Sequence, residues 1–261
     1  MARALGLAHA TLYLRSKQAI KDKQVAVAIE QWHELDETLG HRKLAVLLGM
    51  GKNRVKRVMH KYGLVARRQR KRDVYPGKAS VVAPNLVRDL EAESTQEVVF
   101  SDIFEVRLAD GTRVRGCFAL WKRTRHILGL AFDYGMPASL VVSTVQMLQF
   151  AVPSAIWHSD QGKQYGAEAT RKVLLEKGFQ LSMSRAGTPT DNGSAERLVG
   201  LFKLAVAERQ AYRTLGDFLR AAEQWVNFYN TTRPHESLGY RSPDQYAKEQ
   251  GLAHVPSITL L

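Results

Sequence analysis

The stretch QEVVFSDIFEVRLADGTRVRGCFALWKRTRHILGLAFD, residues 96–133, decides the fold of this chain. It contains apolar, β-branched runs at 96–108, 113–122 and 125–133, and the turn sequence ADGT at 109–112 separates the first two. Runs of this composition and length predict strands, and a short turn between two of them predicts a hairpin. We therefore expect three consecutive strands at the start of one sheet.

Helical and strand patterns alternate after these three runs. We predict helices at 137–150, 166–178, 191–212 and 214–230, and strands at 154–160 and 179–184. Consecutive strands followed by alternating helices and strands are typical of a mixed sheet with helices on its faces. The fold class predicted for this part is therefore α/β.

The N-terminal part of the sequence predicts helices, because its apolar residues have helical spacing and no strand pattern. Residues 18–38 predict one helix, and 41–48 and 53–62 predict two short helices across the turn GMGKN at 49–53. Such a pair is typical of a helix-turn-helix, although an ordinary helical hairpin with a solvated basic face fits the spacing equally well. The second short helix is expected to carry several cations outward: Lys52, Arg54, Lys56, Arg57 and Lys61.

Positive charge gathers at the N-terminus. The 261 residues carry a net charge of +13, and residues 1–80 hold 18 Lys and Arg against 6 Asp and Glu. The run RRQRKR adds Arg67, Arg68, Arg70, Lys71 and Arg72. A clustered charge of this size favours a nucleic-acid partner over a merely basic surface, with the run contacting phosphates. A nuclear-localisation signal is a weaker interpretation of the same run.

These patterns predict four segments: a helical DNA-binding domain at 1–66, a basic run and linker at 67–95, an α/β core at 96–230 and a tail packed on the core at 231–261. The one cysteine, Cys117, excludes a disulfide framework and a cysteine-rich zinc site. No run of about 18 apolar residues occurs, so we expect no membrane span and a cytoplasmic protein.

Three acids stand at the positions where α/β sheets carry their chemistry. Asp102 lies within the first predicted strand, Asp160 ends the strand 154–160, and Glu196 lies in the first turns of the helix 191–212. Carboxylates that converge repel one another unless cations neutralise them, and Mg²⁺ suits oxygen ligands. Taken singly, each acid favours a structural role: Asp160 as a turn cap, and Glu196 as a favourable charge at a helix start.

The spacing of these acids carries a family resemblance. Asp160 and Glu196 have 35 residues between them, and Lys203 follows Glu196 by 7, on the same helix face. The words WHSDQGKQYGAE, LSMSRAGTPTDNGSAERLVGLFK and FYNTTRPHESLGYRSPDQYA resemble the OrfB transposases of the IS-three (insertion sequence three) family. HRKLAVLLGMGKNRVKRVMHKYGLVARRQRKR resembles the helix-turn-helix that precedes their integrase core.

The resemblance implies an RNase H-like fold in which Asp102, Asp160 and Glu196 bind two Mg²⁺ ions, with Mn²⁺ as a substitute. It implies hydrolysis of a phosphodiester at an element end and transfer of the freed 3′-hydroxyl to target DNA. It further implies double-stranded DNA, a homo-oligomer on DNA and an upstream-frame protein of the same element as partners, at the bacterial nucleoid. The family pattern around the first acid has Trp and Thr where this chain has Val99 and Phe104.

Further residues support the predicted site. Lys203 is expected to contact the DNA end. Asn192 either orients Glu196, touches DNA or caps the helix, and His158 either approaches the metal ions or packs at a strand end. Two other functions stay open: a catalytically silent DNA-binding protein derived from a transposase, and a related nuclease without strand transfer.

Overall fold

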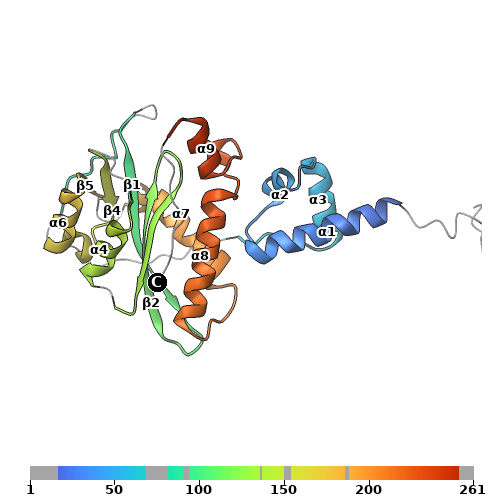
Figure 1. Cartoon of the computed structure of the whole chain (residues 1–261), viewed down its shortest axis with the longest axis horizontal. Coiled ribbons are helices and arrows are strands. Elements are labelled where there is room, and N and C mark those ends of the chain that lie inside the picture. The colour runs from blue at the N-terminus through green and yellow to red at the C-terminus, as the bar shows by residue number, and fades with distance from the viewer. Residues whose placement is uncertain are drawn as a thin grey trace, which may run out of the picture. The chain divides into compact units, whose positions relative to one another are not determined.

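The computed structural model describes residues 17–68, 82–90, 94–135, 137–149, 154–185 and 188–252. The chain divides into two compact units, residues 1–67 and 68–261 (Figure 1). Within the described residues, no helix is both long and apolar enough to cross a membrane.

The first unit contains the helices α1 (Lys17–Leu35), α2 (His41–Leu47) and α3 (Lys52–Lys61). All three match predicted helices to within a few residues. Leu44 of α2 and Val55 and Val58 of α3 are fully buried, so these short helices pack through their apolar sides. The N-terminal helical region is therefore confirmed, and its use as a helix-turn-helix on DNA stays a prediction.

A buried acid that the sequence pattern did not reveal holds this unit together. Asp22 of α1 is buried and accepts hydrogen bonds from Arg57 at 2.6 and 2.7 Å and from Lys61 at 3.1 Å. The Arg57 contact is the largest of the influences that hold the pKa of Asp22 well below its usual range. Arg57 and Lys61 were expected to point outward. Both instead form ion pairs with Asp22 inside the unit.

The second unit contains one five-stranded sheet in the order β3-β2-β1-β4-β5. Its strands are β1 (Val98–Arg107), β2 (Arg113–Trp121), β3 (Ile127–Asp133), β4 (Ile156–Ser159) and β5 (Gln180–Met183). β1, β2 and β3 are antiparallel neighbours, whereas β4 runs parallel to both β1 and β5. The predicted mixed sheet is confirmed.

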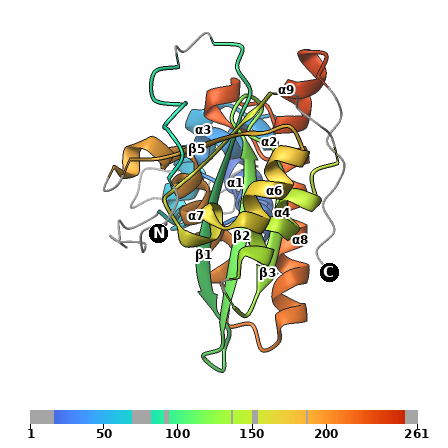
Figure 2. The same cartoon turned by 90° about the vertical axis from the view of Figure 1, so that its left-hand side faces the viewer.

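Helices cover both faces of this sheet (Figure 1). One face carries α4 (Ala138–Gln146) and α6 (Glu168–Glu176), with the short α5 (Lys163–Gly166) between them, and Figure 2 looks onto this face. The opposite face carries α7 (Gly193–Phe202) and α8 (Leu215–Thr231). The last helix, α9 (Pro243–Glu249), packs against α8.

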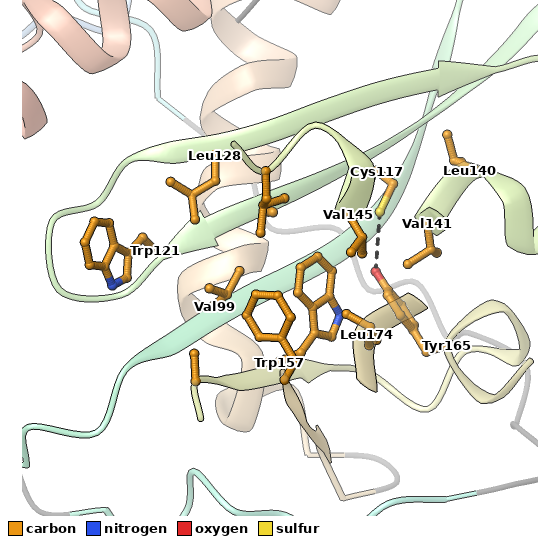
Figure 3. Close-up of a cluster of buried hydrophobic side chains, with 14 of the residues drawn as sticks. Val99, Cys117, Trp121, Leu128, Leu140, Val141, Val145, Trp157, Tyr165 and Leu174 are labelled. Carbon is orange, nitrogen blue, oxygen red and sulfur yellow. Dashed lines mark hydrogen bonds between the residues drawn. The ribbon is translucent and has the colours of Figure 1, made fainter. Parts of the chain in front are cut away.

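Alternation along β1 sends its side chains to two different cores. Val99 joins Trp157, Cys117 and Leu174 beneath α4 and α6 (Figure 3). Phe104 faces the other way and packs its ring on those of Phe118, Phe132 and Phe202. Both departures from the family pattern around Asp102 are thus core residues.

Two parts of the structure differ from prediction. The helix expected at 191–212 is a 3₁₀ turn (Pro189–Asn192), then α7, then a π-helical turn, η4 (Lys203–Ala207). The helix α9 was missed, although its sequence carries a signal. Ser242 and Gln245 form a capping box, and Pro243 occupies the first helical position.

Candidate active site

Strand register brings the first two acids level with each other. Phe100 of β1 pairs with His158 of β4, and Asp102 and Asp160 each follow two residues later on these parallel neighbours. Neighbouring strands lie about 4.8 Å apart, so the two carboxylates start from adjacent backbone positions. Alternation places Asp102 on the same face as Phe100 and Phe104, which is the face that α7 covers.

A tight turn fixes the Asp160 side chain. Its Oδ1 accepts a hydrogen bond from the backbone N–H of Gly162 at 3.0 Å. A Cβ at Gly162 would lie 3.0 Å from that same oxygen, so glycine is the residue that fits here without displacement. The neighbouring Gln161 Nε2 donates to the Ser184 carbonyl at 2.9 Å and ties the turn to the loop after β5.

The third acid, Glu196, is exposed in the first turn of α7. Asn192 stands at the N-cap of this helix, yet its side chain makes no capping bond. Its Nδ2 donates instead to the Ser101 carbonyl at 3.2 Å, directly before Asp102 in the chain. Asn192 is buried, and its Oδ1 has no hydrogen-bond partner among the described residues. The amide therefore fastens the start of α7 to β1, which supports a role in placing Glu196.

The three carboxylates lie within electrostatic reach of one another. Burial first, and then the charges of Asp160 and Glu196, raise the pKa of Asp102 to about 8, although Lys203 opposes them. Burial also raises the pKa of Asp160. Burial and the charge of Asp160 raise the pKa of Glu196. Carboxylates that raise one another's pKa repel as anions, so the site favours a bound cation.

The three carboxylates lie near one another but do not form a preorganised metal-coordination site. Within the part of the chain that the structure describes, no three His, Cys, Asp or Glu side chains stand ready to hold one ion. The donor set itself, three carboxylates from β1, the end of β4 and α7, is of the kind that hard divalent cations prefer.

Lys203 is the residue at which α7 gives way to the π-helical turn, and its backbone is still helical. Seven residues of α-helix turn the chain through almost two full turns, so Lys203 stays on the Glu196 face. Its charge reaches Asp102, as the effect on the pKa of that acid indicates.

His158 is fully buried and packed on Phe100. Its Nδ1 lies 2.8 Å from Ser182 Oγ and its Nε2 lies 3.1 Å from Ser184 Oγ. Burial lowers its pKa to about 4, so the ring is neutral at physiological pH. With both ring nitrogens engaged, the geometry favours a packed histidine over a metal ligand.

The segment 82–90 lies along the edge strand β5. Met183 N donates to the Pro84 carbonyl at 3.3 Å, and Leu86 N donates to Ser182 Oγ at 2.9 Å. Residues that precede the core in sequence therefore pack along the β5 edge of the sheet. No periodicity in residues 73–95 indicates this contact with β5.

The cations predicted to bind DNA differ in their exposure and in their ion pairs. Lys52 and Lys56 are exposed on α3, Arg54 is partly buried, and Arg68 is exposed. Arg67 contacts Glu37, with 3.3 Å between Nη1 and Oε2. Arg70, Lys71 and Arg72 lie outside the described residues. Burial lowers the pKa of His41, and so do the positive charges of its neighbours Lys56, Arg42 and Lys52. The cations of α2 and α3 therefore form one positive surface.

Comparisons with known proteins agree with this fold. Two models of the integrase core domain match residues 92–189 and 177–243. The transposase InsD of insertion element IS2 from Escherichia coli is 30% identical over 234 residues, which is 82% of this chain and 74% of that protein. The transposase of IS904 from Lactococcus lactis is 29% identical over 202 residues, 75% of this chain and 79% of that protein.

The solved intasome of simian T-cell lymphotropic virus, in complex with a PP2A regulatory subunit, contains a chain of similar fold. It superposes with a TM-score of 0.50 at 13% identity, covering 85% of this chain and 75% of that chain. The mixed sheet with flanking helices is thus the RNase H-like integrase core.

The fold and the matched core define a DDE transposase of the integrase superfamily. The chain belongs to the insertion-sequence transposases of the IS-three type, and it is an enzyme of that class.

Proposed function

We propose that Asp102, Asp160 and Glu196 are the catalytic residues of this transposase and together hold two Mg²⁺ ions, with Mn²⁺ as a substitute. The observation that carries the proposal is that these carboxylates, from three elements far apart in sequence, lie within reach of one another's charge: Asp160 and Glu196 raise the pKa of Asp102, and Asp160 raises that of Glu196. Divalent cations relieve that repulsion. When bound, they activate an attacking oxygen and stabilise a leaving one.

The proposed reaction is metal-dependent cleavage and strand transfer on double-stranded DNA. In hydrolysis, the oxygen of a water molecule bonds to phosphorus, the P–O3′ bond breaks, and the departing oxygen takes up a proton as a 3′-hydroxyl. In transfer, that hydroxyl attacks a second phosphodiester, and the displaced 3′-oxygen takes up the proton that the attacking hydroxyl loses. One P–O bond forms for each that breaks, so no energy source is required.

The protein's own residues align this chemistry. Gly162 N holds the Asp160 carboxylate, and Asn192 holds the start of α7 against β1, so the ligands are placed before substrate arrives. Lys203, on the Glu196 face, is positioned to contact a phosphate of the DNA end. His158 supports the wall of the site by packing, through its bonds to Ser182 and Ser184.

The N-terminal unit supplies affinity for DNA in this proposal. Its positive surface on α2 and α3 neutralises phosphates in this proposal. The contacts that we expect are Lys52, Arg54, Lys56 and Arg57, together with the basic run Arg67, Arg68, Arg70, Lys71 and Arg72. Two element ends must be handled together, so we expect a homo-oligomer on DNA. The upstream-frame protein of the element is a further expected partner, and the nucleoid the expected place of action.

The test uses the full chain, duplex DNA carrying the ends of its own element, and Mg²⁺. Asp160→Asn and Glu196→Gln should each abolish cleavage and joining while leaving end binding intact. Asp110→Asn is the matched control, because Asp110 lies in the exposed β1–β2 turn and accepts a hydrogen bond from Thr112 N. An active Glu196→Gln variant would remove Glu196 from the proposed site.

Two outcomes decide between the alternatives. Cleavage without joined products would identify a nuclease without strand transfer. Bound ends with no cleavage in Mg²⁺ or Mn²⁺ would identify a silent DNA-binding protein. A binding constant that falls steeply with salt supports the basic N-terminal unit as the DNA contact, whereas a flat salt response contradicts it.

A further inference from the structure

The turn between β2 and β3 carries an arginine in an unusual backbone conformation. Arg125 has φ of 62°, in the left-handed region that residues other than glycine and asparagine rarely adopt. Its backbone N–H donates to the Trp121 carbonyl at 2.9 Å, which closes the turn. Left-handed backbone is strained for an arginine, and strained residues cluster at functional sites.

The Arg125 side chain reaches the helix that carries Glu196. Its Nη1 donates to Ser194 Oγ at 3.2 Å, in the first turn of α7 and two residues before Glu196. Arg197 stands three residues after Ser194 and therefore on the same side of the helix. The charge of Arg197 acts on Arg125, so the two guanidinium groups lie near each other on one side of α7.

No acid neutralises this pair within the described residues. Burial lowers the pKa of Arg125, and the like charge of Arg197 lowers it further, while no carboxylate acts on it. The neighbouring Arg123 differs: it is ion-paired with Glu97, with 2.8 Å between Nη2 and Oε1. A partly buried cation beside a second cation is unfavourable alone and becomes favourable when an anion binds between them.

We propose that Arg125, with Ser194 and Arg197, binds a backbone phosphate of the DNA at the start of α7. The anion class follows from the donors, because a guanidinium fork and a hydroxyl match phosphate oxygens. The position follows from Ser194: the bound phosphate lies at the start of α7, within one turn of Glu196 along the helix axis but on the opposite side of the helix, because residues two apart do not face each other. The inference rests on the proposed function, because DNA is the anion considered.

The experiment measures binding of the full chain to duplex DNA from the element's own end, in a Glu196→Gln background where the proposed chemistry is blocked. Arg125→Asn removes the charge but tolerates left-handed backbone. It should weaken binding about 10-fold or more, as expected for loss of a hydrogen bond to a charged group. It should also lower the slope of log affinity against log salt by about 1. Arg123→Asn, from the same turn, should stay within about twofold.

A second arm identifies the phosphate. Each phosphate around the cleavage site is replaced, one at a time, by an uncharged methylphosphonate. One replacement should weaken the binding of the Arg125-containing protein and leave Arg125→Asn unaffected, because the contact is already lost. If every replacement weakens both proteins equally, or if Arg125→Asn binds like its parent, the proposal is overturned.

Folding and chemistry are controlled separately. Thermal unfolding compares each variant with its parent, and Arg125→Lys retains a charge without the fork. If Arg125→Asn does not fold, Arg125→Lys decides: weaker binding with an unchanged salt slope, traced to one phosphate, supports the proposal, and unchanged binding overturns it. Failure of the chain with Glu196 intact to cleave DNA would contradict the proposed function, while the binding arms would still report on Arg125.

Discussion

Asn85 Nδ2 donates a hydrogen bond to Asp191 Oδ2 at 2.9 Å. This bond joins the segment 82–90, which precedes the core in sequence, to the loop that leads into α7. Asp191 also accepts hydrogen bonds from the backbone N–H, Nε and Nη2 of Arg185 at 3.1 to 3.2 Å. The loop in front of Glu196 is therefore held from two directions, by its own arginine and by a distant asparagine.

Removing the donor of the Asn85–Asp191 hydrogen bond should slow DNA cleavage. Asn85→Asp places a second carboxylate against Asp191, whose pKa Arg185 already holds below its usual range. We expect cleavage to slow by about 10-fold through displacement of Glu196, with DNA affinity unchanged. Single-turnover rates and equilibrium binding separate these two effects.

Exchange of the two residues provides the control. In the double variant Asn85→Asp, Asp191→Asn, the amide again faces a carboxylate, and the cleavage rate should recover in part, because Asp191→Asn also loses the ion pair with Arg185. Asp89→Asn, in the same segment and exposed, should behave like the unaltered chain. No recovery in the exchanged pair would contradict a positioning role for this bond.

Gly129→Ala should destabilise the second unit. A Cβ at Gly129 in β3 would lie 2.6 Å from the Thr144 carbonyl of α4, and backbone cannot move aside as a flexible side chain does. We expect a loss of about 1–3 kcal/mol in the free energy of unfolding. Gly216→Ala, whose nearest contact would be at 3.7 Å within α8, should be neutral or slightly stabilising. Chemical denaturation of both variants measures the difference.

Restoring the family residue at position 104 should harm this protein. Phe104 packs closely over Gly116, where a Cβ would meet its ring at 2.5 Å, so the two residues are matched in size. Phe104→Thr leaves that space empty and buries a hydroxyl, at a cost of about 3 kcal/mol or more. Tyr134→Thr, at an exposed ring, should change stability by no more than about 0.5 kcal/mol. A stabilised Phe104→Thr variant would refute this size matching.

Acid should loosen the N-terminal unit through Asp22. Because its pKa is depressed in the folded state, its ion pairs stabilise the unit above the ordinary pKa, about 4. That stabilisation is lost as the pH falls below this value and the carboxylate becomes protonated. Protection of the α1–α3 amides, measured against the intrinsic exchange rate at each pH, should fall there in the unaltered chain. Asp22→Asn should show fast exchange already at neutral pH, with no such step on acidification.

Sequence patterns predicted the elements whose side chains alternate or repeat regularly. The three strands at 98–107, 113–121 and 127–133 were predicted to within a few residues, because their apolar runs end at polar turns. The same reasoning overlooked α9, whose start shows only in its capping residues. It also extended one helix across Lys203–Ala207, since the sequence there keeps helical composition while the backbone widens into a π turn.

The predicted site contained the three acids, but not what holds them. Asn192 was predicted as a possible cap, and its bond to the Ser101 carbonyl depends on β1, 91 residues earlier. The sequence analysis overlooked three further residues: Asn85, Asp22 and Arg125. Each acts through a tertiary contact, and the spacing of residues along the chain does not indicate such contacts. The assignment of Asp102, Asp160 and Glu196 as metal ligands stays a prediction.

The segment 82–90 also has a consequence for self-association. β5 is the last strand on its side of the sheet, and an uncovered edge strand offers free N–H and carbonyl groups to any other extended chain. The Pro84 carbonyl accepts from the Met183 N–H on this edge, the Leu86 N–H bonds the Ser182 side chain, and proline itself cannot donate to a strand. Loss of this segment would therefore free the Met183 N–H of the edge strand to bond another extended chain.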